Sequence, residues 1–392
     1  MTNRRQFISL AASLPALSLL PGGVNAATEP KSTPNKLLVL IYFKGGNDNY
    51  NTIIPFTSAK YYKHRPTLAI KREATLHLNE TQGFNAALKP LLPLWDAREL
   101  AIVQGIGQQE ITNQHYRDLE MQFTGAGPDQ FFRDGWLTRA FTKNPQSANK
   151  LDCIGFDDLD IRENDPMGPF RGDQHRVVQI QHPSEWLTHQ NIAATQHEVS
   201  SRAKDIAKTF AQAARIPLKA NFPADAFGDA LKATVEMAAA GIAPPVVHIT
   251  LNALDGDQHN AFDTHWDQQK HHGPVLARFA SGLNAFRDAM REIGQWENTL
   301  LATYDEFGRC PKETEKQGTH HGWASIQFVA GGRVKGGLYG EAVPVIDVYA
   351  IDGPEPIIDY RSLYTTVIEN WWGHSADGIF ARRFKPLDIL KA

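Results

Sequence analysis

One continuous apolar segment near the start of the chain restricts the possible fold more than any other feature. Residues 37–43 read Leu-Leu-Val-Leu-Ile-Tyr-Phe, and Gly45-Gly46 follow shortly after. A strand with one face in water alternates apolar and polar side chains, whereas a strand covered on both faces does not. The segment therefore predicts a central strand of a sheet that has helices on both sides.

Similar apolar segments recur along the chain and alternate with segments of helical periodicity. We expect further strands at residues 100–103, 245–251, 299–304 and 324–330, and helices at 88–97, 115–123, 193–216, 226–241 and 275–293. Strands that alternate with helices predict an α/β fold with a mostly parallel sheet covered on both faces. We expect residues 37–392 to form one domain. The stretch near 151–190, which is rich in Gly, Pro and Asp, is interpreted as an insertion.

The first 26 residues have the pattern of a twin-arginine signal peptide. Arg4-Arg5 precede an apolar stretch at residues 8–20, and small residues ending at Ala26 form a cleavage site. A polar tether at residues 27–36 follows. Because proteins with such a signal are exported after folding, we expect a periplasmic or otherwise exported protein. An N-terminal anchor and a disordered basic tail are the alternative interpretations.

Composition argues against two kinds of partner. The 40 basic and 43 acidic residues nearly balance, so the chain lacks the basic character of nucleic-acid-binding proteins. No segment is apolar for long enough to span a bilayer, so we expect no stable membrane insertion. Cys153 and Cys310 are too few for a disulfide framework, and their spacing leaves open whether they form one bridge.

Polar side chains gather just after the predicted strands. They are Asn47-Asp48-Asn49, Thr112 to His115, Asp255 with His259, Asp263 with His265, Glu306 with Arg309, and His320-His321. Because open α/β sheets build their sites where parallel strands end, we expect these loops to meet at one edge. Each group alone also has a structural interpretation: Asp48 as a turn residue, Asp263 with His265 as a helix cap, and Glu306 with Arg309 as a salt bridge.

Carboxylates and imidazoles together predict a metal site. This mixture of oxygen and nitrogen ligands favours zinc, manganese or iron over calcium. Three carboxylates with two or three imidazoles could hold two divalent cations. Two cations about 4 Å apart can clamp the attacking and leaving oxygens of a phosphoryl or sulfuryl transfer. The pair His320-His321, in a tight loop beside glycines, has little packing purpose and strengthens this interpretation.

The motifs as a set resemble domain-of-unknown-function family 1501, in their order and spacing and over nearly all of the chain after the signal. They are Gly45-Gly46-Asn47-Asp48, Asp263-Thr264-His265, Glu306-Phe307-Gly308-Arg309, Gly318-Thr319 with His321-Gly322, the segment 331–337 and Tyr360-Arg361-Ser362-Leu363-Tyr364. That family is grouped with the alkaline phosphatase and sulfatase superfamily. The resemblance implies a three-layer α/β/α sandwich, and twin-arginine signals are common in the family.

The resemblance also implies roles for individual residues. The metal ligands would be Asp48, Asp263, His265, Glu306 and His321, with His320 as a replacement ligand. Thr112 falls at the place of the nucleophile. His115 would transfer a proton or fix its loop, and Arg309 would pair with the substrate or brace Glu306. Members of the family are often encoded beside another exported family, which implies a possible co-exported protein partner.

The chain departs from the family pattern at several of these positions. Asn49 stands where the family has glycine, and Thr112-Asn113-Gln114-His115 stand where it has Ser-Arg-Ser-His. The hydroxyl is kept, but the arginine that could clamp an anion is lost. His320 replaces an acid. Glu306-Phe307 replace the Asp-His of superfamily hydrolases, which removes one imidazole from the expected two-metal site.

These observations predict an exported, metal-dependent hydrolase of phosphate or sulfate esters. The expected cofactors are divalent metal ions, with zinc, manganese and calcium as candidates. The expected substrate is an anionic ester, either a small molecule or carried on a polymer. The alternative is a non-catalytic binding or assembly module on the same fold. A redox enzyme with an organic cofactor is disfavoured, because no Gly-rich nucleotide loop follows a strand.

Overall fold

The computed structural model describes residues 36–109, 111–145, 151–156, 168–172, 177–180, 217–253, 261–347 and 353–391. The chain divides into two compact units, residues 1–34 and 35–392, and all described residues belong to the second. The predicted signal peptide, the helix expected at 193–216, and Asp255 with His259 lie outside the described residues.

A nine-stranded sheet forms the centre of the described unit. Its order is β13-β5-β12-β9-β1-β8-β6-β7, and β14 also pairs with β5. The strands are β1 (Leu37–Phe43), β5 (Leu100–Gly107), β6 (Cys153–Phe156), β7 (Val177–Ile180), β8 (Val246–Leu251), β9 (Thr299–Tyr304), β12 (Ser325–Ala330), β13 (Gly337–Gly340) and β14 (Ile358–Asp359). Every pairing in it is parallel except the two that β12 makes with β5 and β9. The predicted mostly parallel sheet is confirmed.

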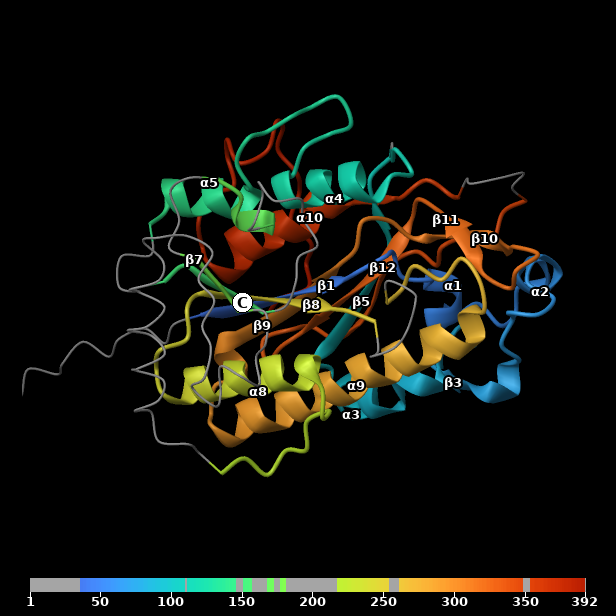
Figure 1. The fold of residues 1–392 in the computed structure, drawn as a ribbon, viewed down its shortest axis with the longest axis horizontal. Helices are drawn as coiled ribbons and strands as arrows, with labels where there is room; N and C mark the ends of the chain where they lie inside the picture. Colours follow the sequence, from blue (N-terminus) through green and yellow to red (C-terminus); the bar gives the residue numbers. More distant parts are fainter. Residues whose placement is uncertain are drawn as a thin grey trace, which may run out of the picture. The chain divides into compact units, whose positions relative to one another are not determined.

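Helices cover both faces of this sheet (Figure 1). On one face lie α3 (Leu92–Asp96), α8 (Ala226–Ala239) and α9 (Gln268–Glu292), and on the other lie α4 (His115–Thr124), α5 (Trp136–Lys143) and α10 (Tyr360–Thr365). The predicted α/β/α sandwich is therefore confirmed. No helix in the described ranges has both the length and the apolar composition needed to cross a membrane.

The central position of β1 explains its continuous apolar sequence. It pairs with β8 on one side and β9 on the other, so that Leu38 lies opposite both Val246 and Leu300. Its odd-numbered residues, Leu37 to Phe43, belong to the core cluster under α8 and α9. Its even-numbered residues, Leu38 to Tyr42, belong to the cluster under α5 and α10. Both faces are therefore apolar, as predicted.

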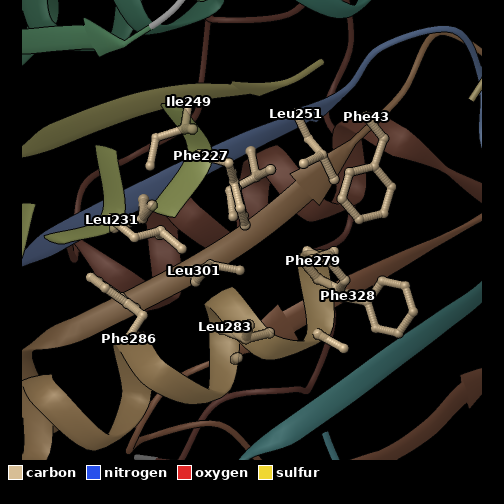
Figure 2. Packing of buried hydrophobic residues seen from close by; sticks show 14 of the residues in the cluster. Phe43, Phe227, Leu231, Ile249, Leu251, Phe279, Leu283, Phe286, Leu301 and Phe328 are labelled. Atoms are coloured by element: carbon tan, nitrogen blue, oxygen red, sulfur yellow. The ribbon is translucent and has the colours of Figure 1, made fainter. Parts of the chain in front are cut away.

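Aromatic and branched side chains fill the first of these clusters (Figure 2). The ring of Phe43 meets the ring of Phe279 of α9 edge-on, with centroids 4.8 Å apart, and Phe279 in turn contacts Phe328 of β12 at 5.2 Å. Burying each such side chain contributes roughly 1.5–3 kcal/mol. This packing holds α9, and therefore the loop that precedes it, firmly against the sheet.

Smaller elements surround the sheet. They are α1 (Asn49–Thr52), β2 (Ile53–Ile54), α2 (Ala59–His64), β3 (Thr75–His77), β4 (Gly83–Asn85), β10 (Arg309–Glu313) and β11 (Thr319–His321), with a π-helix at Thr366–Trp371 and 3₁₀ turns at Arg72–Ala74, Ala86–Leu91, Gly168–Phe170 and Trp296–Asn298. Strands β10 and β11 form an antiparallel hairpin, and β2, β4 and β3 form a small sheet.

Three segments differ from what the sequence predicted. Strands β6 and β7 fall within the range 151–190 that was interpreted as an insertion, and both belong to the central sheet beside β8. Helix α9 begins at Gln268 rather than at Val275, and it includes Pro274. The helix expected at 88–97 is a 3₁₀ turn followed by α3, and Pro90 lies inside the turn.

The two cysteines are both buried, and neither forms a disulfide. Cys153 lies in β6 and Cys310 in β10. Burial raises the pKa of the Cys153 thiol far above its usual value, so this thiol stays protonated. The structure thus answers the question that the spacing left open: there is no bridge between them.

Candidate metal centre

Four side chains from separate segments converge beyond the ends of the parallel strands. His115 begins α4 after β5, Asp263 and His265 lie between β8 and α9, and His321 ends β11. One donor atom from each lies within 4.8 Å of the others, which makes this a possible metal site. Three of the six predicted metal ligands, Asp263, His265 and His321, are thus brought together. His115, predicted as a proton-transfer residue, joins them.

The nitrogen atoms of this group are unusually close. Nε2 of His265 and Nε2 of His321 lie 3.0 Å apart. The Asp263 carboxylate lies 2.9 Å from Nε2 of His265, 3.7 Å from Nε2 of His321 and 3.5 Å from Nε2 of His115. Two unprotonated ring nitrogens at such a distance repel each other, so a proton or a cation must lie between them.

Two of the imidazoles are oriented by hydrogen bonds from Nδ1 to fixed acceptors. Nδ1 of His115 donates a hydrogen bond of 2.7 Å to Oε1 of Glu306, and Nδ1 of His321 donates one of 3.0 Å to the backbone carbonyl of Asn113. Asn113 presents that carbonyl from a left-handed conformation, with φ of 58°. These bonds leave each Nε2 facing the group, which is how metal-binding histidines are commonly held.

Asp263 is the charged centre of the group. Its Oδ1 accepts a hydrogen bond of 2.6 Å from the Arg309 guanidinium. Burial acts to raise the pKa of Asp263, but its contacts with His115, His265 and His321, together with the charge of Arg309, hold it far below its usual range. This carboxylate is therefore ionised at every physiological pH and available as an oxygen ligand.

Arg309 is held in place by backbone carbonyls. Its guanidinium donates to the carbonyls of Gly45, Gly46 and Thr319, and its side chain has no exposed surface. The prediction that Arg309 pairs with substrate or braces Glu306 is corrected here, because it braces Asp263 and is closed off from the solvent.

The imidazoles differ in their protonation. Although burial lowers the pKa of His115, the hydrogen bonds that its ring donates to Asp263 and Glu306 raise it to about 9. Burial and the positive charges of Arg309 and His115 lower the pKa of His321. In the metal-free site His115 is therefore protonated at neutral pH and His321 is not.

The group is partly open to solvent. The side chains of His115 and His265 are 32% and 30% exposed, whereas those of Asp263 and His321 are 18% and 13% exposed. The two outer imidazoles are therefore more open to solvent than the carboxylate.

Asp48 has a different role from the predicted one. Its carboxylate is completely buried and forms an ion pair with Arg65, in which Nη2 of Arg65 lies 2.9 Å from Oδ1. It also accepts hydrogen bonds from the Gln268 amide and from the backbone N–H of Tyr50. Burial raises its pKa, but Arg65 outweighs this and the net pKa is lowered. Asp48 lies outside the converging group.

Arg65 and Gln268 were not identified from the sequence. A carboxylate in a buried loop indicates that some cation must neutralise it. No local pattern, however, identifies a residue 17 positions along the chain as that cation. With Asp48 neutralised, the residues described by the structure assemble one group of this kind.

The other predicted residues lie around the group. Oε1 of the buried Glu306 accepts from the Gly45 N–H at 3.1 Å as well as from His115, so it supports His115 from behind. His320 is exposed and lies outside the group, with its ring centroid 6.0 Å from that of His265. The two predicted ligands Glu306 and His320 are thus neighbours of the group and not members of it.

Thr112 lies in the turn before α4. Its hydroxyl donates to Oδ1 of Asp118 at 3.0 Å, and the N–H groups of Thr112 and Gln114 also bond to that carboxylate. Burial raises the pKa of Asp118 to about 6. The predicted nucleophile therefore has a proton acceptor beside it, and the same contacts fix the turn that presents His115.

The sequence comparisons agree with the predicted resemblance. The model of the family described as "Protein of unknown function (DUF1501)" matches residues 224–366, a stretch that includes Asp263, His265, Glu306, Arg309 and His321. The predicted relation to this family is confirmed over that stretch. A comparison with curated proteins finds no match.

Several solved structures are similar to this chain at low identity. The phosphonate monoester hydrolase from Silicibacter pomeroyi is 12% identical, with 89% of this chain and 76% of that one covered and a TM-score of 0.38. A protein in the alkaline phosphatase superfamily from Vibrio parahaemolyticus is 11% identical, with 78% and 62% covered and a TM-score of 0.34. The C-terminal periplasmic domain of EcEptC from Escherichia coli, in a complex with Zn, is 11% identical, with 76% and 74% covered and a TM-score of 0.33.

Proposed function

We propose that this chain is an exported, metal-dependent hydrolase of phosphate or sulfate esters that uses one divalent cation. The observation that supports it most is the convergence of three imidazoles and one ionised carboxylate at a partly open site. The export part of the proposal depends on the twin-arginine pattern at Arg4-Arg5.

The donor set fits a transition metal better than calcium. Three imidazole nitrogens and one carboxylate oxygen suit zinc or manganese, whereas calcium takes six to eight oxygen ligands. The separation of 3.0 Å between Nε2 of His265 and Nε2 of His321 is also explained by a shared cation. His115, Asp263, His265 and His321 would hold the ion, and zinc is the first choice.

A cation at this position would polarise an ester oxygen and counter the negative charge that develops there. The residues of the chain would supply the rest. Glu306 orients His115 through Nδ1, and Arg309 keeps Asp263 ionised and fixed.

Thr112 is the proposed nucleophile. Its Oγ1 would form the bond to phosphorus or sulfur while the bond to the ester oxygen breaks, and its proton would pass to Oδ1 of Asp118. The departing alkoxide would take a proton from water. A pKa of about 6 leaves that carboxylate ionised at neutral pH. Water would then cleave the Thr112 ester and restore the hydroxyl. The substrate would be an anionic ester, small or polymer-borne.

A second function is favoured by one specific observation. Four protein donors can complete a tetrahedral set, which is typical of structural zinc sites. The chain would then be a binding or assembly module that recognises a co-exported protein, with the cation as a brace.

The test begins with metal content per chain, measured by elemental analysis after purification without chelator. One equivalent, lost in His321→Ala, together with turnover of phosphate or sulfate esters that is lost in Thr112→Val while the metal is kept, supports the hydrolase. One equivalent without turnover, together with a stoichiometric partner recovered from periplasmic extract, supports the module. A protein that neither contains nor takes up zinc, manganese or calcium contradicts the metal site.

A further inference from the structure

A buried amide links the two loops that carry the converging side chains. Gln268 is the first residue of α9 and has no exposed surface. Its carbonyl oxygen accepts hydrogen bonds from the hydroxyls of Thr264, at 3.0 Å, and Thr319, at 2.8 Å. Thr264 lies between Asp263 and His265, and Thr319 is two residues before His321. One side chain thus touches both loops.

The other end of this amide is fixed by Asp48. The NH₂ group of Gln268 donates to Oδ2 of Asp48, and the ion pair with Arg65 keeps this carboxylate ionised, so that both of its oxygens accept. The amide therefore has one allowed orientation, with its NH₂ toward the carboxylate and its oxygen toward the two hydroxyls. The ion pair of Asp48 and Arg65 in this way sets the direction of the hydrogen bonds that reach the site.

Backbone contacts reinforce the same junction. The N–H of Gln268 bonds to the carbonyl of Gln317 at 2.9 Å, and the N–H of Thr319 bonds to the carbonyl of Thr264 at 3.0 Å. The β10–β11 hairpin is therefore docked on the start of α9. Because α9 itself is packed against the sheet, the hydrogen bonds of the amide hold the segments that carry His265 and His321 in fixed positions.

We propose that Gln268 is a positioning residue that sets the distance between His265 and His321, and that Asp48 with Arg65 acts as its anchor. This assigns a purpose to a buried ion pair that does not contact the converging group. The inference rests on the proposed metal centre, because its main consequence is a higher affinity for the cation.

Two variants of neighbouring glutamines test the proposal. Gln268→Met keeps the volume and removes all three side-chain hydrogen bonds, whereas Gln269→Met changes an exposed residue of the same helix turn. We expect Gln268→Met to weaken zinc binding by about 10- to 100-fold, the usual effect of losing an orienting partner. Gln269→Met should bind zinc as the wild type does. Zinc affinity is measured by competition with a chromophoric chelator.

A milder variant guards against a folding defect. Thr319→Val replaces the hydroxyl with a methyl group of nearly the same shape. Far-ultraviolet circular dichroism and a melting curve show whether this variant is folded. We expect Thr319→Val to weaken zinc binding less than Gln268→Met does. Equal zinc affinity in the wild type, Gln268→Met and Thr319→Val overturns the positioning role.

A second readout does not require bound metal. In the metal-free protein, the ¹⁵N NMR signals of the His265 and His321 rings should shift in Gln268→Met and stay in place in Gln269→Met. If the wild type binds no zinc, the proposed function fails, but this readout still decides the positioning role. Unshifted signals in a folded Gln268→Met variant overturn it.

Discussion

His265 and His321 are 56 positions apart in the sequence, yet their Nε2 atoms lie 3.0 Å from each other. The first precedes α9, and the second ends a hairpin whose loop is hydrogen-bonded to the start of that helix. Asp263 contacts both rings, and His115 completes the group from α4. A single cation would satisfy all four residues.

Replacing a member of the group should remove metal binding, whereas replacing its neighbour should not. We expect His321→Ala to weaken zinc binding by more than the roughly 10- to 100-fold that the loss of an orienting partner causes. His320→Ala is the matched control, because His320 is adjacent, exposed and outside the group. Calorimetric titration with zinc measures both. Equal losses in the two variants would contradict the assignment of His321 over His320.

Metal binding should depend on pH through His115. Its pKa of about 9 means that a cation must displace a proton from Nε2 at neutral pH. We expect zinc affinity to rise by up to about tenfold per pH unit below pH 9 while this proton is released. Titrations in buffers of different ionisation enthalpy count the protons. Release that is unchanged in His115→Gln would show that the proton comes from another group.

The stability of the metal-free protein should depend on pH in the opposite direction. The folded-state pKa of His115, about 9, exceeds the unfolded value of about 6.5. The contribution of His115 to the free energy of unfolding is therefore complete below pH 6.5 and is lost as the pH rises through 9. Urea unfolding of chelator-treated protein between pH 6 and pH 10 measures this. If the urea midpoint of His115→Gln depends on pH as that of the wild type does, the pH dependence does not come from His115.

The ion pair between Asp48 and Arg65 should matter for folding. Both side chains are fully buried, so Arg65→Met leaves an uncompensated carboxylate and should lower the free energy of unfolding by about 3–5 kcal/mol. Asp48→Asn combined with Arg65→Met should cost less than the sum of the single changes, because no buried charge is left alone. Chemical denaturation measures these values. Additive losses would mean that the two residues act independently.

One glycine in the hairpin should be indispensable for the site. A Cβ at Gly318 would lie 2.0 Å from the carbonyl carbon of His265, so Gly318→Ala must push the hairpin away from the loop that carries this histidine. We expect weaker zinc binding and a lower melting temperature. Gly273→Ala in α9 is the control, because a Cβ there meets nothing within 4 Å outside its own chain neighbours, so its zinc affinity should equal that of the wild type. Unchanged zinc affinity in Gly318→Ala would contradict the tight packing.

Local sequence patterns were sufficient for the framework of the fold. The apolar residues 37–43 predicted a strand covered on both faces, and the structure places β1 between β8 and β9. Residues 299–304 are the strand β9 as predicted. Burial of one face gives apolar residues a period of two in a strand and 3.6 in a helix, so the pattern is visible in a short stretch of sequence. Strands β6 and β7 are short and are surrounded by Gly, Pro and Asp, so no such pattern predicted them.

The sequence by itself determined which residue types stand at the ends of the strands, and so it pointed to Asp263, His265 and His321. Only the tertiary structure decided that His115 joins them, that Arg309 braces Asp263, and that Arg65 neutralises Asp48. Which buried charges meet depends on how distant segments pack, because a carboxylate takes whichever cation the fold brings within a few ångströms. Strand and helix periodicity is written in neighbouring residues, whereas the pairing of charges is set by contacts across the whole domain.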